Sequence, residues 1–330
     1  MATHLEKGEL NPHVPIVQSQ FKPAWWCRNP HLQTLWPLAV KPPHPKLNRE
    51  RIELPDGDFI DLDWTTNKND PVVLVIHGLE GSAHSHYARR ILHTLPDKGY
   101  RGVLMHFRGS SGEPNRLPRA YHSGETGDLN YIFDLLSDRH ESLHAIIAYS
   151  LGGNVLLKWL GEKQNKTLDI KAIAVSVPFV LSELADHMNK GFPRVYQRYL
   201  VKSLHKTFEA KSRIVDLHLT TEQIEKLRSF WEFDDKVTAR LHGFTGAKDY
   251  YNKSSSRQFL IRINTPTLVI QAKDDPFMSS NVIPDAHELS DSVTLELTEH
   301  GGHVGFISGG TPRRPQFWIE DRIIKYLADK

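Results

Sequence analysis

One serine of this sequence stands in a turn that suits a nucleophile. Ser150 follows an apolar stretch, residues 145–149, that reads as a buried strand, and an apolar helical pattern begins directly after it. Ala148 and Gly152 place small side chains two residues to either side, as so sharp a strand-to-helix turn requires. The spacing matches the nucleophile-elbow pattern G-x-S-x-G, with alanine in place of the first glycine. It predicts that the Ser150 hydroxyl projects from a strained turn above the edge of a sheet.

A serine hydroxyl needs a neighbouring base, and the base needs an acid that orients it. In chains with a nucleophile elbow the acid and then the histidine follow the serine, each in a loop after a later strand. Asp274 and Asp275 follow one expected strand, and His300 and His303 follow the next one. We favour Asp275, which precedes a proline, and His303, which is flanked by glycines. Asp274 and His300 remain alternatives, since two adjacent carboxylates cannot both face one imidazole.

The third requirement is an oxyanion hole, because a tetrahedral intermediate develops negative charge that fixed N–H groups must stabilise. One donor is expected to be the backbone N–H of Leu151, directly after the nucleophile. The second is expected from the loop after the first parallel strand, where Gly78 and Gly81 permit a tight turn. Within that loop we expect the N–H of Leu79 to be the donor.

These residues need a scaffold, and the pattern around them predicts an α/β fold. From residue 71 onward, short apolar runs alternate with amphipathic stretches of helical length, which is typical of a mostly parallel sheet covered by helices on both faces. A hairpin with its turn at 55–57 precedes them, and a helix is expected to start at Asn29 and Pro30. The expected strands are 51–54, 59–64, 71–76, 102–107, 145–149, 172–177, 267–271 and 293–297, and the expected helices are 87–97, 128–136, 152–161, 282–289 and 315–328.

The chain divides into a core with an insertion. Residues 1–24 are rich in proline and polar side chains and are expected to form an arm over the core. The neighbouring Trp25 and Trp26 are expected to pack on the core, and the alternative is that they contact lipid or a membrane. Residues 25–178 and 260–330 form the expected α/β core. Residues 179–259 break the alternation and are expected to form a helical cap or lid over Ser150, with a pocket for a short or medium acyl chain. The alternative is that the aromatic side chains of this insertion only hold its own helices together.

Composition narrows the functional classes. The 330 residues are 39% apolar and 24% charged, and the net charge of +2 leaves no basic field for nucleic-acid binding. A single cysteine, Cys27, excludes an internal disulfide framework. No apolar run approaches the length of a membrane span, and the first residues lack the pattern of a signal peptide. We therefore expect a cytoplasmic protein without an integral membrane segment.

Histidines are frequent enough, at 19, to make a metal site worth testing. His84 and His86 form a His-x-His pair near His77 and His122, but Ala88 stands where a binuclear metallohydrolase carries a carboxylate. No H-E-x-x-H motif and no phosphate-binding glycine loop is present either. These histidines are expected on the surface or in loops, and we expect no metal and no cofactor.

Several motifs together resemble one known family. The sequence is similar to the type-4 family of the AB hydrolase superfamily, which includes bacterial esterase-like proteins and eukaryotic abhydrolase-domain lipid hydrolases. The similarity runs from about residue 20 to the C-terminus, and its motifs are residues 25–34, 77–82, 107–112, 121–128, 150–154, 231–234 and 301–306.

The resemblance implies an α/β-hydrolase fold in which Ser150, Asp275 and His303 form the charge relay. It also implies a carboxylesterase-type serine hydrolase that acts on small-molecule substrates, either short- to medium-chain acyl esters or acylglycerols of lipid metabolism. A thioesterase or acyltransferase would use the same residues. The alternative from another class is a catalytically silent α/β-hydrolase fold that serves as a binding module. The sequence leaves the oligomeric state open.

Overall fold

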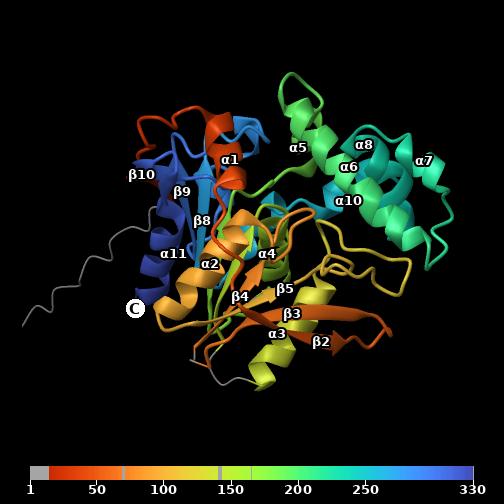
Figure 1. Ribbon diagram of the computed structural model, residues 1–330, viewed down its shortest axis with the longest axis horizontal. Helices are drawn as coiled ribbons and strands as arrows, with labels where there is room; N and C mark the ends of the chain where they lie inside the picture. Colours follow the sequence, from red (N-terminus) through yellow and green to blue (C-terminus); the bar gives the residue numbers. More distant parts are fainter. Residues whose placement is uncertain (1–14, 69–70, 140–142, 165, 330) are drawn as a thin grey trace, which may run out of the picture.

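A nine-stranded sheet forms the centre of the molecule (Figure 1). The computed structural model describes residues 15–329 apart from 69–70, 140–142 and 165, so most of the expected N-terminal arm lies outside the described residues. The strands are β1 (Ile16–Gln18), β2 (Leu47–Glu53), β3 (Phe59–Thr65), β4 (Val72–Ile76), β5 (Arg101–Met105), β6 (Leu143–Tyr149), β7 (Lys171–Val175), β8 (Thr267–Ala272) and β9 (Val293–Thr298).

The strand order is β1-β9-β8-β7-β6-β4-β5-β3-β2. From β1 to β5 every neighbouring pair is parallel, while β3 runs antiparallel to both β5 and β2. The predicted α/β-hydrolase fold with a mostly parallel sheet is therefore confirmed. One strand was not expected, since β1 comes from the N-terminal arm and pairs with β9 at the far edge of the sheet.

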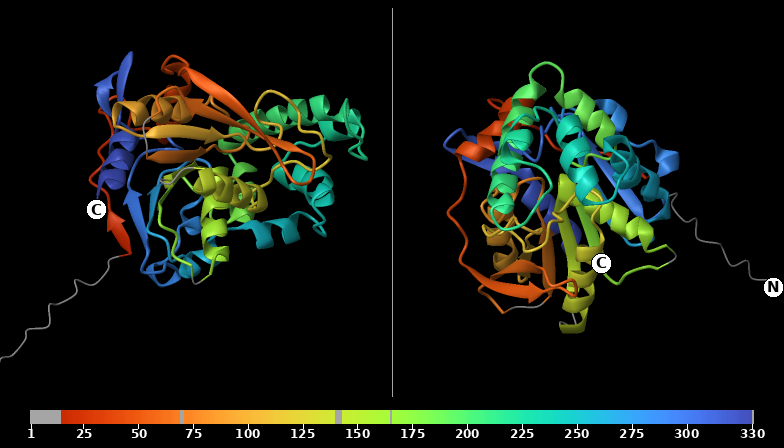
Figure 2. Two further views of the ribbon diagram at one scale, coloured as in Figure 1. Left: turned by 90° about the horizontal axis from the view of Figure 1, so that it is seen from below. Right: turned by 90° about the vertical axis from the view of Figure 1, so that its right-hand side faces the viewer.

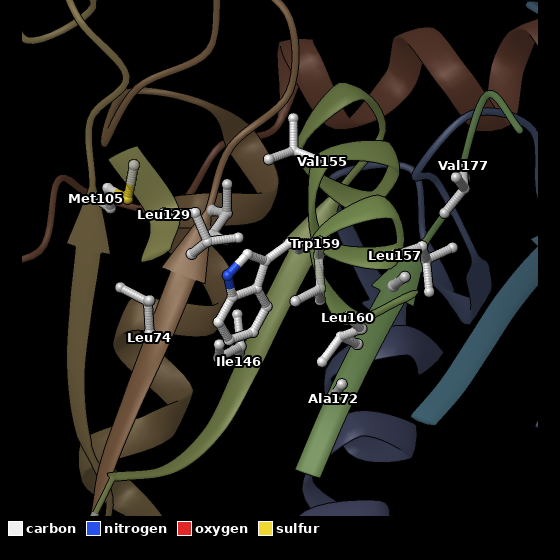
Figure 3. Close-up of a cluster of buried hydrophobic side chains, with 14 of the residues drawn as sticks. Leu74, Met105, Leu129, Ile146, Val155, Leu157, Trp159, Leu160, Ala172 and Val177 are labelled. Carbon is white, nitrogen blue, oxygen red and sulfur yellow. The ribbon is translucent and has the colours of Figure 1, made fainter. Parts of the chain in front are cut away.

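Helices cover both faces of this sheet. Successive side chains of β4 point to opposite faces, and all of them are buried, which explains the unbroken apolar run in the sequence. One face packs against α3 (Gly127–Arg139) and α4 (Leu151–Glu162), and the other against α2 (His86–Asp97) and α11 (Trp318–Ala328). Figure 3 shows the first of these layers, where Trp159 of α4 reaches Ile146 of β6.

A helical segment is inserted between β7 and β8 and lies to one side of the sheet (Figures 1 and 2). It has a hydrophobic cluster of its own that includes Tyr196, Phe208 and Phe233. Its elements are α5 (Leu181–Met188), α6 (Pro193–Ser212), α7 (Thr221–Glu225), α8 (Phe230–Phe233), the π-helix η1 (Asp234–Thr238), α9 (Ala239–Leu241) and α10 (Ala247–Ser254), and the 3₁₀ helix η2 (Arg257–Arg262) leads back to the sheet.

The helix expected near the N-terminus is confirmed as α1 (Pro30–Ala39). The Asn29 side chain accepts hydrogen bonds from the N–H groups of His31 and Leu32, so it caps the helix. A two-stranded sheet of β10 (Ile307–Thr311) and β11 (Arg314–Phe317) contacts α1, because the indole N–H of Trp36 donates to the carbonyl of Pro312 in its turn.

One expected helix near the C-terminus is wrong, and another is confirmed with a later start. Residues 282–289 form no continuous helix but two 3₁₀ segments, η3 (Ser280–Val282) and η4 (Ala286–Glu288). Pro284 stands between them, and proline both lacks an N–H and disfavours helical backbone in the residue before it. The helix expected to start at residue 315 begins at Trp318 instead, because the preceding residues pair as β11.

The tryptophan pair divides into two environments. Trp26 packs edge-on against Trp36, with ring centroids 5.6 Å apart, and its indole N–H donates to the carbonyl of Gly310. Trp25 is 80% exposed, so the expectation that both rings pack on the core is wrong for Trp25.

Candidate active site

Ser150 occupies a strained turn between β6 and α4. Its φ of 53° and ψ of −119° lie where residues with a side chain are rarely found. The neighbours must be small: a Cβ on Gly152 would lie 2.4 Å from the carbonyl oxygen of His77, and one on Gly153 would lie 2.8 Å from Val177 Cγ2. The turn therefore has the backbone strain and the close packing that the elbow pattern predicts.

His303 lies between Ser150 and Asp275. Its Nε2 is 3.0 Å from Ser150 Oγ, and its Nδ1 is 2.8 Å from Asp275 Oδ2. Because the Asp275 carboxylate accepts a hydrogen bond from Nδ1–H, the proton stays on Nδ1 and Nε2 keeps a lone pair that faces the serine hydroxyl. The ring stacks on Phe277 with centroids 4.0 Å apart, which fixes its plane.

The two alternative residues form a separate pair. Asp274 Oδ2 lies 3.1 Å from Nδ1 of His300, and its Oδ1 accepts the backbone N–H of Gly302 at 3.0 Å. Burial raises the pKa of Asp274. The structure thus brings Asp275 and His303 to Ser150 and pairs Asp274 with His300.

The loop that carries His303 rests on α1. A Cβ on Gly302 would lie 2.6 Å from the carbonyl oxygen of Pro30, and one on Gly305 would lie 2.2 Å from that of Gln33, so both positions require glycine. The His303 N–H donates to Thr34 Oγ1 at 2.9 Å. A helix near the N-terminus therefore sets the position of the imidazole.

The expected oxyanion loop passes directly beside the serine. A Cβ on Gly78 would lie 3.1 Å from Ser150 Cβ. Two tyrosine hydroxyls accept backbone hydrogen bonds at 2.8 Å on either side of Leu79: Tyr87 from Gly78 and Tyr121 from Glu80. Leu79 and Leu151 both line the cavity that contains Ser150. The loop geometry is thus fixed by side chains on α2 and on the segment before α3.

Of the histidines considered as metal ligands, His77, His84 and His122 lie in loops, as expected, whereas His86 is the first residue of α2. His77 donates from Nδ1 to the carbonyl of Gly78 and accepts the N–H of Phe107 at Nε2, and burial lowers its pKa to about 3. His86 and His122 are buried as well, whereas His84 is exposed. Both nitrogens of His77 are thus used within the fold.

Within the described ranges, one set of side chains comes close enough to share an ion, and it contains none of these histidines. It consists of Asp285, His287 and Glu288 at the surface. Glu288 is already held by Arg257 through two hydrogen bonds of 2.8 and 2.6 Å.

A cavity of about 580 Å³ opens above Ser150 and His303. Its walls come from the core and from the inserted helices, and they are mostly apolar. Representative lining residues are Leu79, Leu151, Leu204, Phe208, Phe233 and Phe277. The aromatic side chains of the insertion therefore contribute both to its own core and to the cavity wall. A concave apolar site with a few polar groups is the usual form of a small-molecule pocket.

Two carboxylates are among the polar groups that line this cavity. Asp234, the first residue of the π-helix, accepts hydrogen bonds of 2.7 Å from Tyr251 and Thr238, and burial raises its pKa to about 6. Glu80 accepts from the hydroxyls of Ser203 and Thr207, at 3.1 and 2.7 Å.

Sequence reasoning missed several residues that support the site. Asn154 donates to the carbonyls of Ser123 and Ser254 and so ties α4 to α10. The hydroxyl of Ser176 accepts the N–H of Val304, next to the histidine. Asn154 and Thr34 lie inside motifs of the family resemblance, which gave no role to either, while Ser176 carried no sequence signal.

Of the helices within the described part of the chain, none combines the length and the apolar composition that a membrane crossing requires.

Comparisons with known proteins agree with this architecture. A family model described as the alpha/beta hydrolase fold matches residues 71–310. The chain is 45% identical over 321 residues to the Escherichia coli (strain K12) protein named “Putative esterase YheT”, with 94% of this chain and 93% of that protein covered. It is 30% identical over 332 residues to “Phospholipase ABHD3” of Mus musculus, with 97% and 80% covered.

A solved structure gives the same fold. The Pyrococcus furiosus esterase Pf2001 has a TM-score of 0.54 with this chain at 17% identity, and the superposition covers 86% of this chain and 92% of that one. At this level of identity the likeness shows the fold alone.

Proposed function

The chain belongs to the family of α/β-hydrolase-fold proteins, and from this premise we propose that it hydrolyses carboxylic esters through an acyl-enzyme on Ser150. The observation that carries the proposal is the hydrogen-bonded series from Ser150 through His303 to Asp275, with distances of 3.0 and 2.8 Å. The esterase and phospholipase named among the relatives support the same class of reaction.

Acylation begins when Ser150 Oγ attacks the ester carbonyl and His303 Nε2 takes its proton. Asp275 stabilises the imidazolium that forms and keeps the imidazole in the correct tautomer. The backbone N–H groups of Leu79 and Leu151 are the proposed donors to the oxyanion, and one such donor is worth about 3 kcal/mol. His303 then protonates the leaving alcohol, and the acyl group stays on Ser150.

Deacylation repeats these steps with a water molecule as the nucleophile. His303 removes a proton from the water, the resulting nucleophile attacks the acyl carbonyl, and Ser150 leaves with the proton returned. The products are the carboxylic acid and the regenerated enzyme. No metal or organic cofactor takes part in these steps, because the histidine supplies all proton transfers.

We propose that the reaction takes place in a core of residues 25–178 and 260–330. Residues 179–259 form a lid over this core, and residues 1–24 form an arm. The lid supplies part of the apolar cavity wall, for example Leu204 and Phe208. We therefore propose short- to medium-chain acyl esters or acylglycerols as substrates, with the acyl chain in this cavity.

Acyl-chain length should control the rate if the chain enters the cavity. Each buried methylene contributes about 0.8 kcal/mol, so kcat/KM should rise roughly fourfold per CH₂ until the cavity is full. A further increase in length should then lower kcat/KM, because overfilling a packed site is costly. The measurement compares acetyl, butyryl, hexanoyl and octanoyl esters of one alcohol. Equal kcat/KM values along the series would mean that the acyl chain stays in water, and the lid proposal would fail.

A fluorophosphonate probe tests the proposed reaction without knowledge of the substrate. The probe reacts covalently with an activated serine, so the native protein should become labelled and Ser150→Ala should not. Ser308→Ala, which changes a serine of the β10–β11 hairpin, is the matched control and should label like the native protein. A native protein that resists the probe would favour the silent binding module.

A further inference from the structure

The mouth of the cavity is bordered by exposed apolar side chains. The lining residues that are exposed to solvent come mainly from α1 and from the start of α6, so the cavity opens between these two helices. They include Leu35, Leu38, Phe192, Val195 and Tyr199, and Tyr199 is 73% exposed.

The two helices are fixed against one another at this mouth. His31 Nδ1 of α1 lies 2.8 Å from the hydroxyl of Tyr196 on α6, and the His31 ring contacts Phe192 with centroids 4.4 Å apart. The two exposed apolar rows therefore lie next to each other. We call Leu32, Leu35, Leu38, Phe192, Val195 and Tyr199 the apolar rim.

Each row follows helical spacing but faces away from the core. Leu32, Leu35 and Leu38 occur at every third position of α1, and all three are at least 40% exposed. Val195 and Tyr199 are one turn apart on α6. Scattered exposed leucines need no explanation, but a contiguous apolar patch around a cavity mouth marks an interaction surface.

Positive charge adjoins the apolar rim. Helix α6 carries the exposed cations Arg194, Arg198, Lys202 and Lys206, and within the described ranges none of them forms an ion pair. Lys202 and Lys206 continue the same exposed stripe that begins with Val195 and Tyr199, because they follow at helical intervals of three and four residues. On the other side of the mouth, the exposed Lys41 lies just beyond the end of α1.

Basic side chains outnumber acidic ones on this surface, where Glu209 and Glu225 line the same groove as Arg198, Lys202, Lys206 and Arg228. The acidic residue of α6, Glu209, is paired with Arg213 at the far end of the helix. Glu80 lies within the cavity and is occupied by the hydroxyls of Ser203 and Thr207. A surface that is apolar at its centre and cationic at its border suits a partner with an apolar interior and an anionic face.

We propose that the apolar rim and the cations of α6 dock this protein on a lipid surface that carries negative charge. Apolar side chains of the rim enter the boundary between headgroups and acyl chains, while Lys202 and Lys206 contact the anionic headgroups. The cavity mouth then opens into the lipid, so that an ester can enter without crossing water. This last step rests on the proposed function, whereas docking itself does not.

Co-sedimentation with vesicles tests docking, and the Ser150→Ala protein is used so that no hydrolysis takes place. It should bind vesicles of phosphatidylglycerol and phosphatidylcholine in equal parts about tenfold or more tightly than vesicles of phosphatidylcholine alone. Binding should weaken in high salt, because exposed charges are screened. Equal binding to the two vesicle types, or to neither, would overturn the proposal.

Matched variants locate the surface. Lys202→Glu combined with Lys206→Glu should lower the affinity for the charged vesicles about tenfold or more. The control makes the same charge change with Lys226→Glu and Lys248→Glu, which lie at the end of α7 and on α10, and it should bind like the parent protein. If the control lost as much affinity, net charge rather than this surface would explain binding.

A second pair of variants tests how much the apolar rim contributes to vesicle binding. Leu32→Glu lies on the rim, whereas Ile214→Glu lies beyond the opposite end of α6 and changes a side chain that is 57% exposed. Leu32→Glu alone should reduce vesicle binding, and thermal melting should show that both variants remain folded. Sedimentation velocity in the absence of lipid provides a further check. A concentration-dependent dimer that Leu32→Glu abolishes would mean that a second copy covers the rim, and the lipid proposal would be wrong.

Discussion

Ser150→Ala is expected to lower kcat for ester hydrolysis by about 10⁶-fold, the scale found when the nucleophile of a serine protease is removed. Alanine keeps the Cβ and therefore the same backbone strain at a φ of 53°. The melting temperature should accordingly stay close to that of the native protein. Steady-state kinetics with a hexanoyl ester, together with thermal melting, measure both quantities.

His303→Ala should cost nearly as much activity, because the histidine and the serine act as one unit. The double variant should therefore be little worse than either single variant. If the fold-loss in kcat of the double variant equalled the product of the two single losses, the two residues would act independently. The acyl-enzyme proposal would then have to be abandoned. Melting curves are needed here as well, because the alanine removes the stacking on Phe277 and leaves the buried Asp275 without its partner.

Asp275→Asn is expected to lower kcat by about 10⁴-fold, as the equivalent change does in a serine protease. The asparagine NH₂ group favours the tautomer in which Nδ1 of His303 is an acceptor. Nε2 then carries the proton and cannot take the one from Ser150. KM should change little, since Asp275 is buried behind the imidazole and makes no contact with the substrate in the proposed mechanism.

Asp274→Asn is the matched control for this position. Asp274 is a neighbouring carboxylate of the same loop, but it pairs with His300 and the N–H of Gly302. Its replacement should change kcat less than tenfold, because the hydrogen bonds that it disturbs are ordinary contacts within the loop. If Asp274→Asn were the more damaging variant, the assignment of the acid would be off by one residue.

The α/β fold could be predicted from the sequence because most of its signals are local. The apolar run of β4 and the small residues around Ser150 each specify a structure within a few positions. The cap of α1 is equally local, since Asn29 bonds to N–H groups two and three residues away. The positions of Asp275 and His303 after later strands followed from the order of those strands.

Other features depend on contacts that no local pattern specifies. The hydroxyl of Ser176 meets Val304 across 128 positions of sequence, and the stacking of Phe277 on His303 depends on how two loops meet. The helix expected over 282–289 failed for a local reason that was visible, since Pro284 lies within it. The burial of His77 depends on Phe107, whose N–H it accepts from the neighbouring strand end.

The contact of α1 with the histidine loop also fixes when the site can form. Thr34 and Gln33 bond to His303 and Ile307, which lie 269 and 274 positions later, and β1 pairs with β9. Contacts of such separation form late in folding, because the loop between them must be closed first. A chain emerging from the ribosome therefore contains Ser150 long before it contains His303, which lies 153 positions later. In the proposed mechanism, activity therefore requires a nearly complete chain in which α1 has met the loop of His303.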